Sequence, residues 1–276
     1  MSVTPAPLGP ITTVTFTAPD LAAVSELYET YLGYRVVTRT EVSETQARAW
    51  DAAAVAGRPM LELAPAAAED FRFRVVQASA EHYVPFATHG WNAAELIVRD
   101  VDALAERLAD SPFDIIGEPQ DLSFSADIRA MQILGPGSEL LYLTQFKKPV
   151  PGLDVPAPRC DVDRTFIVIL GGPSMDALQA FYADRFALPR APVVESRVKG
   201  LSAAFGLPPE HRHPIAALPV AGQSLIELDE MPAAAKPRAA RDGELPPGIS
   251  IVSFAAAETR CLRGPAGEIL ELVEAR

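Results

Sequence analysis

Residues 11–34 read ITTVTFTAPDLAAVSELYETYLGY, and this stretch decides the fold. Its first eight residues alternate β-branched or aromatic side chains with threonine, which is the pattern of a half-buried strand. Pro19 ends that strand, Asp20 can cap a helix, and apolar residues then recur at helical spacing as far as Gly33. The stretch predicts a strand followed by a helix. Three further strand candidates, YRVVTRTEV, MLELAP and FRFRVVQAS, complete a βαβββ unit.

The same order of elements recurs three more times along the chain. A second unit begins with NAAELIVRD, a third with RTFIVIL and a fourth with GISIVSF. DLAAVSELYETYLGY resembles SMDALQAFYADRFAL, with Tyr28 matching Tyr182, and GPGSELLYL resembles GPAGEILEL, with Gly135 matching Gly264. The interval inside the fourth unit is much shorter than in the second. We therefore expect the fourth unit to lack its helix and one strand.

Length and composition set the outer limits of the interpretation. A chain of 276 residues predicts two domains, here residues 9–147 and 162–276, joined by a Pro-rich linker over residues 148–161. The formal net charge of −12 disfavours nucleic acid and anionic membrane surfaces as partners. Cys160 and Cys261 form no CxxC pair, so we expect no disulfide framework. Without a signal peptide or a long apolar segment, the expected location is the cytoplasm.

Taken together, these motifs resemble the vicinal-oxygen-chelate superfamily, which includes glyoxalases, bleomycin-resistance proteins and extradiol dioxygenases. The resemblance rests on the Thr-rich first strand ending in PDL, the helix closing on YLGY and the GPxG-E turn before an apolar strand, and it extends from Ile11 to Val273. It implies an α+β fold of paired βαβββ modules forming cupped mixed sheets, with four modules of which the last is truncated. It also implies that the site lies inside a cup.

In that superfamily a histidine on an opening strand and a glutamate or histidine on a closing strand usually hold a metal ion. The opening-strand positions implied here are Thr13, Ala93, Ile167 and Ser250, and the closing-strand positions are Tyr142, Glu227 and Glu271. Two carboxylates without an imidazole partner are a poor site for zinc, iron or nickel. We therefore expect no metal cofactor, with a divalent transition metal as the alternative.

Glu95 is the most informative candidate residue. If Thr13 and Ala93 face into the first cup, period-2 alternation places Thr15, Glu95 and Ile97 on the same inner face. A desolvated carboxylate of raised pKa is what a general base beside a carbonyl group requires. The competing interpretations are a structural ion pair between Glu95 and Arg129, or an outward-facing Glu95 after a one-residue slip in register.

The other predicted contacts with a substrate surround Glu95. Tyr142 and Arg129 are predicted to polarise a substrate oxygen, in part replacing the metal. Thr13, Thr15, Trp91 and Ile97 are predicted to bind the substrate, with Trp91 covering an apolar or aromatic ligand. For Tyr142 and Trp91 a role in core packing is the alternative.

The histidines give a different candidate site. His211 and His213 would share one face of a strand and could join Glu227 and Glu271 in a metal site. The segment PPEHRHP is bracketed by prolines, however, and favours a surface or structural role for both histidines. His82 and His89 are likewise expected to be structural. Glu227, Glu271 and Arg260 are expected to form structural ion pairs in the second cup.

Three hypotheses for function follow, in this order. The first is a metal-independent lyase or isomerase that acts on a carbonyl-bearing or aromatic small molecule, with Glu95, Tyr142 and Arg129 as catalytic residues. The second is a non-catalytic protein that sequesters a ligand, as bleomycin-resistance proteins do. The third is a metal-dependent lyase or dioxygenase that uses the second domain. A homodimer and a monomer are both compatible with four modules in one chain.

Overall fold

The first two modules contain the predicted βαβββ elements, and module 1 also contains a short helix and a 3-10 turn, in a computed structural model that describes residues 8–67, 69–78 and 83–274. Module 1 comprises β1 (Ile11–Ala18), α1 (Leu21–Tyr31), β2 (Tyr34–Glu41), α2 (Glu44–Ala49), a 3-10 turn (Ala53–Val55), β3 (Pro59–Pro65) and β4 (Arg72–Gln77). Module 2 comprises β5 (Gly90–Val98), α3 (Val101–Leu108), β6 (Asp114–Leu122), β7 (Ser125–Leu134) and β8 (Leu140–Phe146).

The last two modules differ from each other in length. Module 3 comprises β9 (Val162–Gly172), α4 (Met175–Phe186), β10 (Val194–Ser196), α5 (Lys199–Ala204), β11 (His213–Val220) and β12 (Ser224–Glu230). Module 4 comprises β13 (Ile249–Ala256), β14 (Arg260–Arg263) and β15 (Ile269–Glu274). The described part of module 4 has three strands and no helix, as predicted. Helices α2 and α5 and strand β11 were not predicted.

Helix α1 begins at Asp20, the capping residue that the sequence indicated, and α4 begins at a similar cap. The Asp20 carboxylate accepts hydrogen bonds from the backbone N–H groups of Ala22 and Ala23, at 2.8 and 3.1 Å. The Ser174 side chain caps the equivalent helix α4. A side-chain acceptor at this position satisfies N–H groups that have no partner within the helix. The repeated helix therefore starts in the same way in modules 1 and 3.

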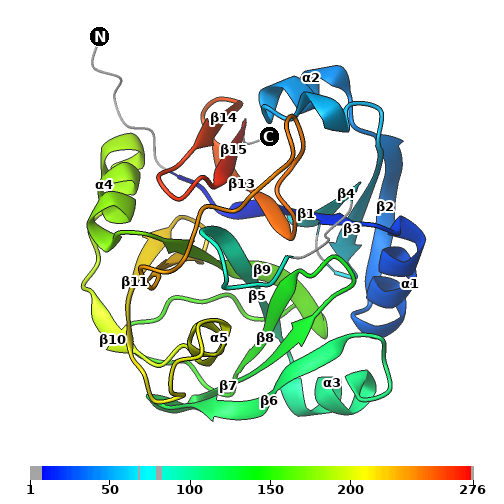
Figure 1. The fold of residues 1–276 in the computed structure, drawn as a ribbon. Helices are drawn as coiled ribbons and strands as arrows, with labels where there is room; N and C mark the ends of the chain where they lie inside the picture. The colour runs from blue at the N-terminus through cyan, green and yellow to red at the C-terminus, as the bar shows by residue number, and fades with distance from the viewer. Residues whose placement is uncertain (1–7, 68, 79–82, 275–276) are drawn as a thin grey trace.

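The modules pair across the two halves of the chain. One sheet has the order β14-β15-β13-β1-β4-β3-β2, and the other has the order β10-β11-β12-β9-β5-β8-β7-β6. Module 1 thus shares a sheet with module 4, through β1 and β13, and module 2 shares a sheet with module 3, through β5 and β9. We had expected residues 9–147 and 162–276 to form one paired unit each. Both sheets instead contain strands from both ranges (Figure 1).

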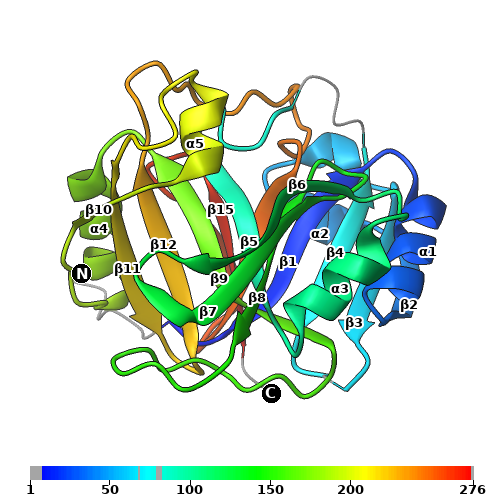
Figure 2. The same cartoon turned by 90° about the horizontal axis from the view of Figure 1, so that it is seen from below.

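The largest core joins the two sheets to the helices. Buried side chains from both sheets and from α1, α3 and α4 form one cluster, among them Phe16, Tyr28, Trp91, Leu104 and Tyr182. Two smaller clusters belong to one sheet each. Both sheets are curled, as Figure 2 shows, and each presents an inner face away from the shared core. In the described ranges, no helix is both long enough and apolar enough to cross a lipid bilayer.

Candidate functional site

The inner face of the 7-stranded sheet holds Glu271 in a saturated network. The Arg74 guanidinium lies 2.9 Å from Glu271 Oε2, and the Ser253 hydroxyl donates to the same oxygen at 2.6 Å. The Trp50 indole N–H donates to Oε1 at 2.9 Å. Burial raises the pKa of the Glu271 carboxyl, but Arg74 and these donors outweigh it and hold the pKa below its usual value. Glu271 is therefore a compensated, ionised carboxylate.

A segment that the sequence left as a polar and alanine-rich interval closes this face. Ser43 and Gln46 form a capping box that starts α2, and Trp50 follows at the end of the helix. Trp50 is buried, and the Arg74 guanidinium lies 5.3 Å from the centre of its ring. The S-x-x-Q spacing of the capping box was the one local signal that could have revealed this helix. No sequence pattern indicated that Trp50 packs against Arg74.

These contacts test whether a metal ion fits the first inner face. The resemblance implied metal ligands at Thr13 and Glu271, yet a guanidinium cation already neutralises Glu271 and no imidazole is present. Across the ranges that the structure describes, no three or more histidine, cysteine, aspartate or glutamate side chains are grouped so that they could hold a metal. The residues present do not fit a metal ion.

The alternative metal site is contradicted because its four members do not converge. Glu227 lies on β12 of the 8-stranded sheet, whereas Glu271 lies on β15 of the 7-stranded sheet. His213 is buried and shares a 2.9 Å hydrogen bond with Ser202 of α5. His211 stacks edge-on against His213, with the ring centres 4.8 Å apart. The structural interpretation of these histidines is supported, whereas the predicted pairing of Arg260 with Glu227 and Glu271 is not, because Arg260 pairs with Glu258 at 3.1 Å.

The inner face of the 8-stranded sheet holds Glu95 without such compensation. Glu95 on β5 is in register with Tyr142 on β8 and with Ile167 on β9. All three side chains are partly exposed, so solvent reaches this face. Burial, followed by the charge of Glu227, raises the pKa of the Glu95 carboxyl to about 7. Glu95 therefore combines a perturbed pKa with access from outside, as a catalytic carboxyl does.

Two further carboxyl groups lie on the same face. Glu227 and Asp229 occupy β12 two residues apart, so both side chains point to the same side of the sheet. Burial raises the pKa of Glu227 to about 7. Asp229 is fully buried, and burial together with Glu227 raises its pKa well above the usual range. Sequence reasoning assigned Glu227 to a different cup and did not consider Asp229.

The registers of the two sheets show why the two inner faces differ. Thr15 pairs with Arg74 in the 7-stranded sheet, and Glu95 pairs with Tyr142 at the corresponding place in the 8-stranded sheet. In the first sheet the guanidinium reaches the carboxylate of the closing strand. In the second sheet a phenol stands in the place of that guanidinium, and an additional carboxyl stands in the place of Thr15. The second face therefore carries acidic groups without the cation that would compensate them.

Helix α5 covers one end of the 8-stranded sheet's inner face. A cluster of buried apolar residues joins it to the sheet, and its members are Phe86, Ala93, Leu140, Ile169, Leu201 and Met231. Partly buried side chains at the margin of this cluster include Tyr142 and Phe205. Figure 2 shows α5 lying across the open end of the curled sheet, and Lys199 of α5 bonds Gln120 of β6 at 2.9 Å. The carboxyl groups thus lie next to an apolar wall.

Several predicted site residues lie elsewhere. Arg129 pairs with Asp102 and Asp121, at 2.8 and 3.2 Å, and not with Glu95. Both predicted roles of Arg129, as an ion-pair partner of Glu95 and as a group near the substrate, are therefore contradicted. Thr13 and Thr15 lie on the 7-stranded sheet because β1 does not pair with β5.

Trp91 and Ile97 flank Glu95 on β5 but are both buried. The Trp91 indole N–H donates to the Ile269 carbonyl at 2.9 Å and the ring packs against Phe254 of the other sheet. The structure supports the packing interpretation of Trp91. Ile97 is in register with Thr144 and lies beneath the site without exposed surface. His82 lies outside the described residues.

The repeated GPxxE turns hold carboxyl groups of a different kind. Glu139 accepts hydrogen bonds from the Gly137 N–H at 2.8 Å and from the Tyr28 hydroxyl at 2.9 Å. Glu268 accepts from the Ala266 N–H at 2.8 Å and from the Tyr182 hydroxyl at 3.4 Å. Burial raises the pKa of both carboxyls to about 7. Each turn is thereby tied to the helix of the preceding module, so we assign these two glutamates a structural role.

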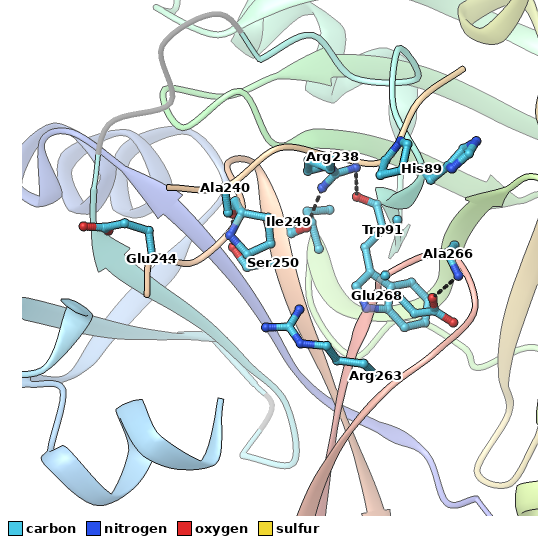
Figure 3. A pocket seen from close by; sticks show the side chains of 14 residues that line it. His89, Trp91, Arg238, Ala240, Glu244, Ile249, Ser250, Arg263, Ala266 and Glu268 are labelled. Carbon is cyan, nitrogen blue, oxygen red and sulfur yellow. Dashed lines mark hydrogen bonds between the residues drawn. The ribbon is translucent and has the colours of Figure 1, made fainter. Parts of the chain in front are cut away.

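A small pocket of about 90 Å³ lies where the 231–248 segment crosses the starts of β5 and β13 (Figure 3). Arg238, a partly buried cation of this pocket, donates from all three guanidinium nitrogens to protein acceptors: Thr88 Oγ1, the carbonyls of Trp91, Pro247 and Ile249, and Asn92 Oδ1. Arg238 therefore ties this segment to both sheets and has no N–H left for a ligand. His89 also lines this pocket, which does not adjoin Glu95.

No family model and no curated protein sequence matches the chain. Among solved structures, glyoxalase I from Zea mays is similar over 96% of this chain and 92% of that chain, with a TM-score of 0.65 and 13% sequence identity. A putative dioxygenase from Bacillus subtilis subsp. subtilis str. 168 is similar over 96% of this chain and 85% of that chain, with a TM-score of 0.60 and 10% identity. These similarities confirm the predicted vicinal-oxygen-chelate fold of paired βαβββ modules.

Proposed function

We propose that this chain, which has the vicinal-oxygen-chelate fold, is a metal-independent lyase or isomerase that acts on a small carbonyl-bearing or aromatic molecule at the inner face of the 8-stranded sheet. The proposal rests on the environment of Glu95. The residue is partly exposed, and its carboxyl has a pKa of about 7 and no cationic partner among the described residues. A base with a pKa near neutrality is half ionised at working pH and still strong enough to accept a proton.

The neighbouring groups support proton transfer at Glu95. The ionised carboxylate would remove a proton from carbon beside the substrate carbonyl. Burial, followed by the charges of Glu227 and Asp229, raises the pKa of Tyr142 well above its usual range, so its hydroxyl stays protonated and can donate a hydrogen bond to the carbonyl oxygen. Glu227, whose pKa is also about 7, can return a proton from another direction.

Carbon–hydrogen exchange tests this proposal without knowledge of the product. Aldehydes and ketones with an α-hydrogen are incubated with the protein in D2O, and deuterium incorporation is followed by mass spectrometry. We expect protein-dependent exchange whose rate rises with pH through about 7, because Glu95 must be ionised. Glu95→Gln is expected to lower the rate by a factor on the order of 10²–10⁴. Treatment with a chelator is expected to leave the rate unchanged.

Glu139→Gln is the matched control for this experiment. It also removes a carboxyl whose pKa is about 7, but one that is enclosed by its own turn and by Tyr28. Its exchange rate should equal that of the wild type. Exchange that persists in Glu95→Gln would contradict the assignment of Glu95 as the base.

A ligand-sequestering protein is the second candidate function. The partly buried apolar side chains of Val198 and Phe205 favour it, because such a surface can hold an apolar ligand without chemistry. This function predicts that a tightly bound compound is recovered unmodified and shows no deuterium incorporation. The two candidates therefore give opposite results in the same assay.

A further inference from the structure

The charge balance of the 8-stranded sheet's inner face is one-sided. Glu95, Glu227 and Asp229 lie on this face, and no lysine or arginine of the described residues forms an ion pair with any of them. Three cationic or imidazole side chains of the neighbouring elements are engaged elsewhere. Lys199 of α5 bonds Gln120, Arg212 bonds the Glu195 carbonyl, and His213 bonds Ser202.

Asp229 supplies an independent observation that points to a ligand. It is fully buried, and neither of its carboxyl oxygens has a hydrogen-bond partner. The Thr144 hydroxyl lies beside Glu95 and its hydrogen bond partly offsets the rise in the Glu95 pKa. Asp229 points into the same face as Glu227, and its charge acts on Tyr142 across the sheet. A buried polar group without a partner is costly, so a ligand with hydrogen-bond donors would stabilise this arrangement.

The carboxyl groups lie on strands of one sheet that are separated by a single strand. Glu95 lies on β5 and Glu227 on β12, with β9 between them, so their backbones are roughly 10 Å apart in a sheet with ordinary strand spacing. The two carboxyl groups are close enough that the charge of Glu227 raises the pKa of Glu95. An ammonium group between the two carboxylates would have three donors and a positive charge. The partly buried side chains at the margin of the apolar cluster, among them Val198 and Phe205, can contact an apolar body attached to it.

The 7-stranded sheet shows what a cation does at the equivalent place. There the Arg74 guanidinium neutralises the closing-strand carboxylate Glu271 at 2.9 Å. Tyr142 replaces that guanidinium in the 8-stranded sheet. The protein therefore provides an internal cation in one sheet and a neutral phenol at the corresponding position in the other.

We propose that the inner face of the 8-stranded sheet binds a small molecule with a protonated primary or secondary amine on an apolar body, the ammonium lying between Glu95 and Glu227 and within reach of Asp229. This inference rests on the proposed function in that it names the substrate class of the same site. The amine would orient the substrate, and the carbonyl-bearing part would extend toward Tyr142.

Calorimetric titration tests the inference with four probes, benzylammonium, phenethylammonium, cyclohexylammonium and butylammonium, and with benzyl alcohol and benzoate as neutral and anionic counterparts of the first. We expect the ammonium compounds to bind at least about tenfold more tightly than benzyl alcohol, and benzoate not to bind. Because bound ammonium favours the ionised carboxylates, binding at pH 6 should release protons. The measured enthalpy should then change with the ionisation enthalpy of the buffer.

Variants separate a specific site from general acidity. Glu95→Gln and Glu227→Gln are each expected to weaken benzylammonium binding at least about tenfold, and Glu139→Gln is expected to leave it unchanged. Tyr142→Arg reproduces the arrangement of the 7-stranded sheet and should abolish binding while circular dichroism remains that of the wild type. If no ammonium probe binds more tightly than benzyl alcohol, or if both glutamine variants bind like the wild type, the inference is wrong.

The two proposals fail separately. Deuterium exchange in neutral ketones, removed by Glu95→Gln, together with no preference for ammonium probes, would overturn the amine inference and leave the general base in place. Ammonium binding that depends on Glu95 and Glu227, without exchange in any amino ketone such as phenacylamine, would support the inference and contradict the proposed catalysis.

Discussion

At the scale of single residues, the closing-strand glutamates of the two sheets have opposite electrostatic environments. Glu271 has Arg74, Ser253 and Trp50 as partners, whereas Glu227 has neighbouring acids and no cation. A buried carboxylate is stable only when it is paired or protonated, which explains why the pKa is lowered in one case and raised in the other. The largest part of the difference is the opposing residue, which is an arginine in one sheet and a tyrosine in the other.

Replacing Arg74 tests this account. Arg74→Met leaves Glu271 buried without its cation and should lower the free energy of unfolding by about 3–5 kcal/mol, measured by urea denaturation at pH 7. The double variant Arg74→Met with Glu271→Leu removes both charges and should recover most of that loss. Arg48→Met, which removes an exposed pair with Glu44, should cost at most about 0.5 kcal/mol. A small effect of Arg74→Met alone would contradict the described network.

At the scale of elements, the GPxxE turn is the part of the repeat that ties modules together. In modules 2 and 4 the turn glutamate accepts a hydrogen bond from the tyrosine of the helix in the preceding module. Gly135 and Gly264 are required because a side chain at either position would overlap the carboxyl of Glu139 or Glu268. The sequence similarity between the repeats thus reflects a shared packing device and not a repeated active site.

The pH dependence of stability should report these turn carboxyls. The folded-state pKa of Glu139 is about 7, above its ordinary value of 4.5, so its contribution is complete below pH 4.5 and is lost as the pH rises toward and through 7. The glutamine of Glu139→Gln cannot ionise. Between pH 5 and 8 the free energy of unfolding of this variant should therefore fall by on the order of 2 kcal/mol less than that of the wild type. Glu268→Gln should behave alike. If the free energy of unfolding, measured by urea denaturation, depends on pH in both variants as it does in the wild type, the raised pKa values are contradicted.

At the scale of the whole molecule, the pairing of module 1 with module 4 and of module 2 with module 3 makes the fold a single interdependent unit. Neither half of the chain contains a complete sheet. The central strand pairs β1 with β13 and β5 with β9 both join residues from opposite sides of the 148–161 linker. Trp91 adds a link between the sheets through its hydrogen bond to Ile269.

Dividing the chain in the linker tests this interdependence. Residues 1–147 and 148–276, produced separately, should each lack a cooperative unfolding transition in circular dichroism, because each half would expose the edges of its central strands. Produced together, the halves should associate and recover the transition of the intact chain. Independent cooperative folding of either half would show that the expected domain boundaries are correct after all.

The sequence predicted most secondary-structure elements but only part of the candidate site. The strands of modules 1 and 2, the capped helices and the truncated fourth module follow from local periodicity and turn chemistry. Local periodicity did not predict three elements, which are helix α5, strand β11 and the Trp50 segment. Their structure depends on packing against an inner face of a sheet. Glu95 was found because an acid amid apolar strand residues is visible in the sequence. Asp229 and the contacts of Arg74 were not visible in that way.

What the sequence by itself determined is therefore the set of modules, their repeated turns and the side of β5 on which Glu95 lies. Alternation along a strand specifies which residues share a face, but it carries no information about the strand that lies alongside. Tertiary structure alone decided that β5 pairs with β9 and not β1, which separates Glu95 from Thr13 and Thr15 and places it opposite Glu227. The same strand pairing places Arg74 beside Glu271. It places no arginine beside the acidic residues of the 8-stranded sheet among the described residues.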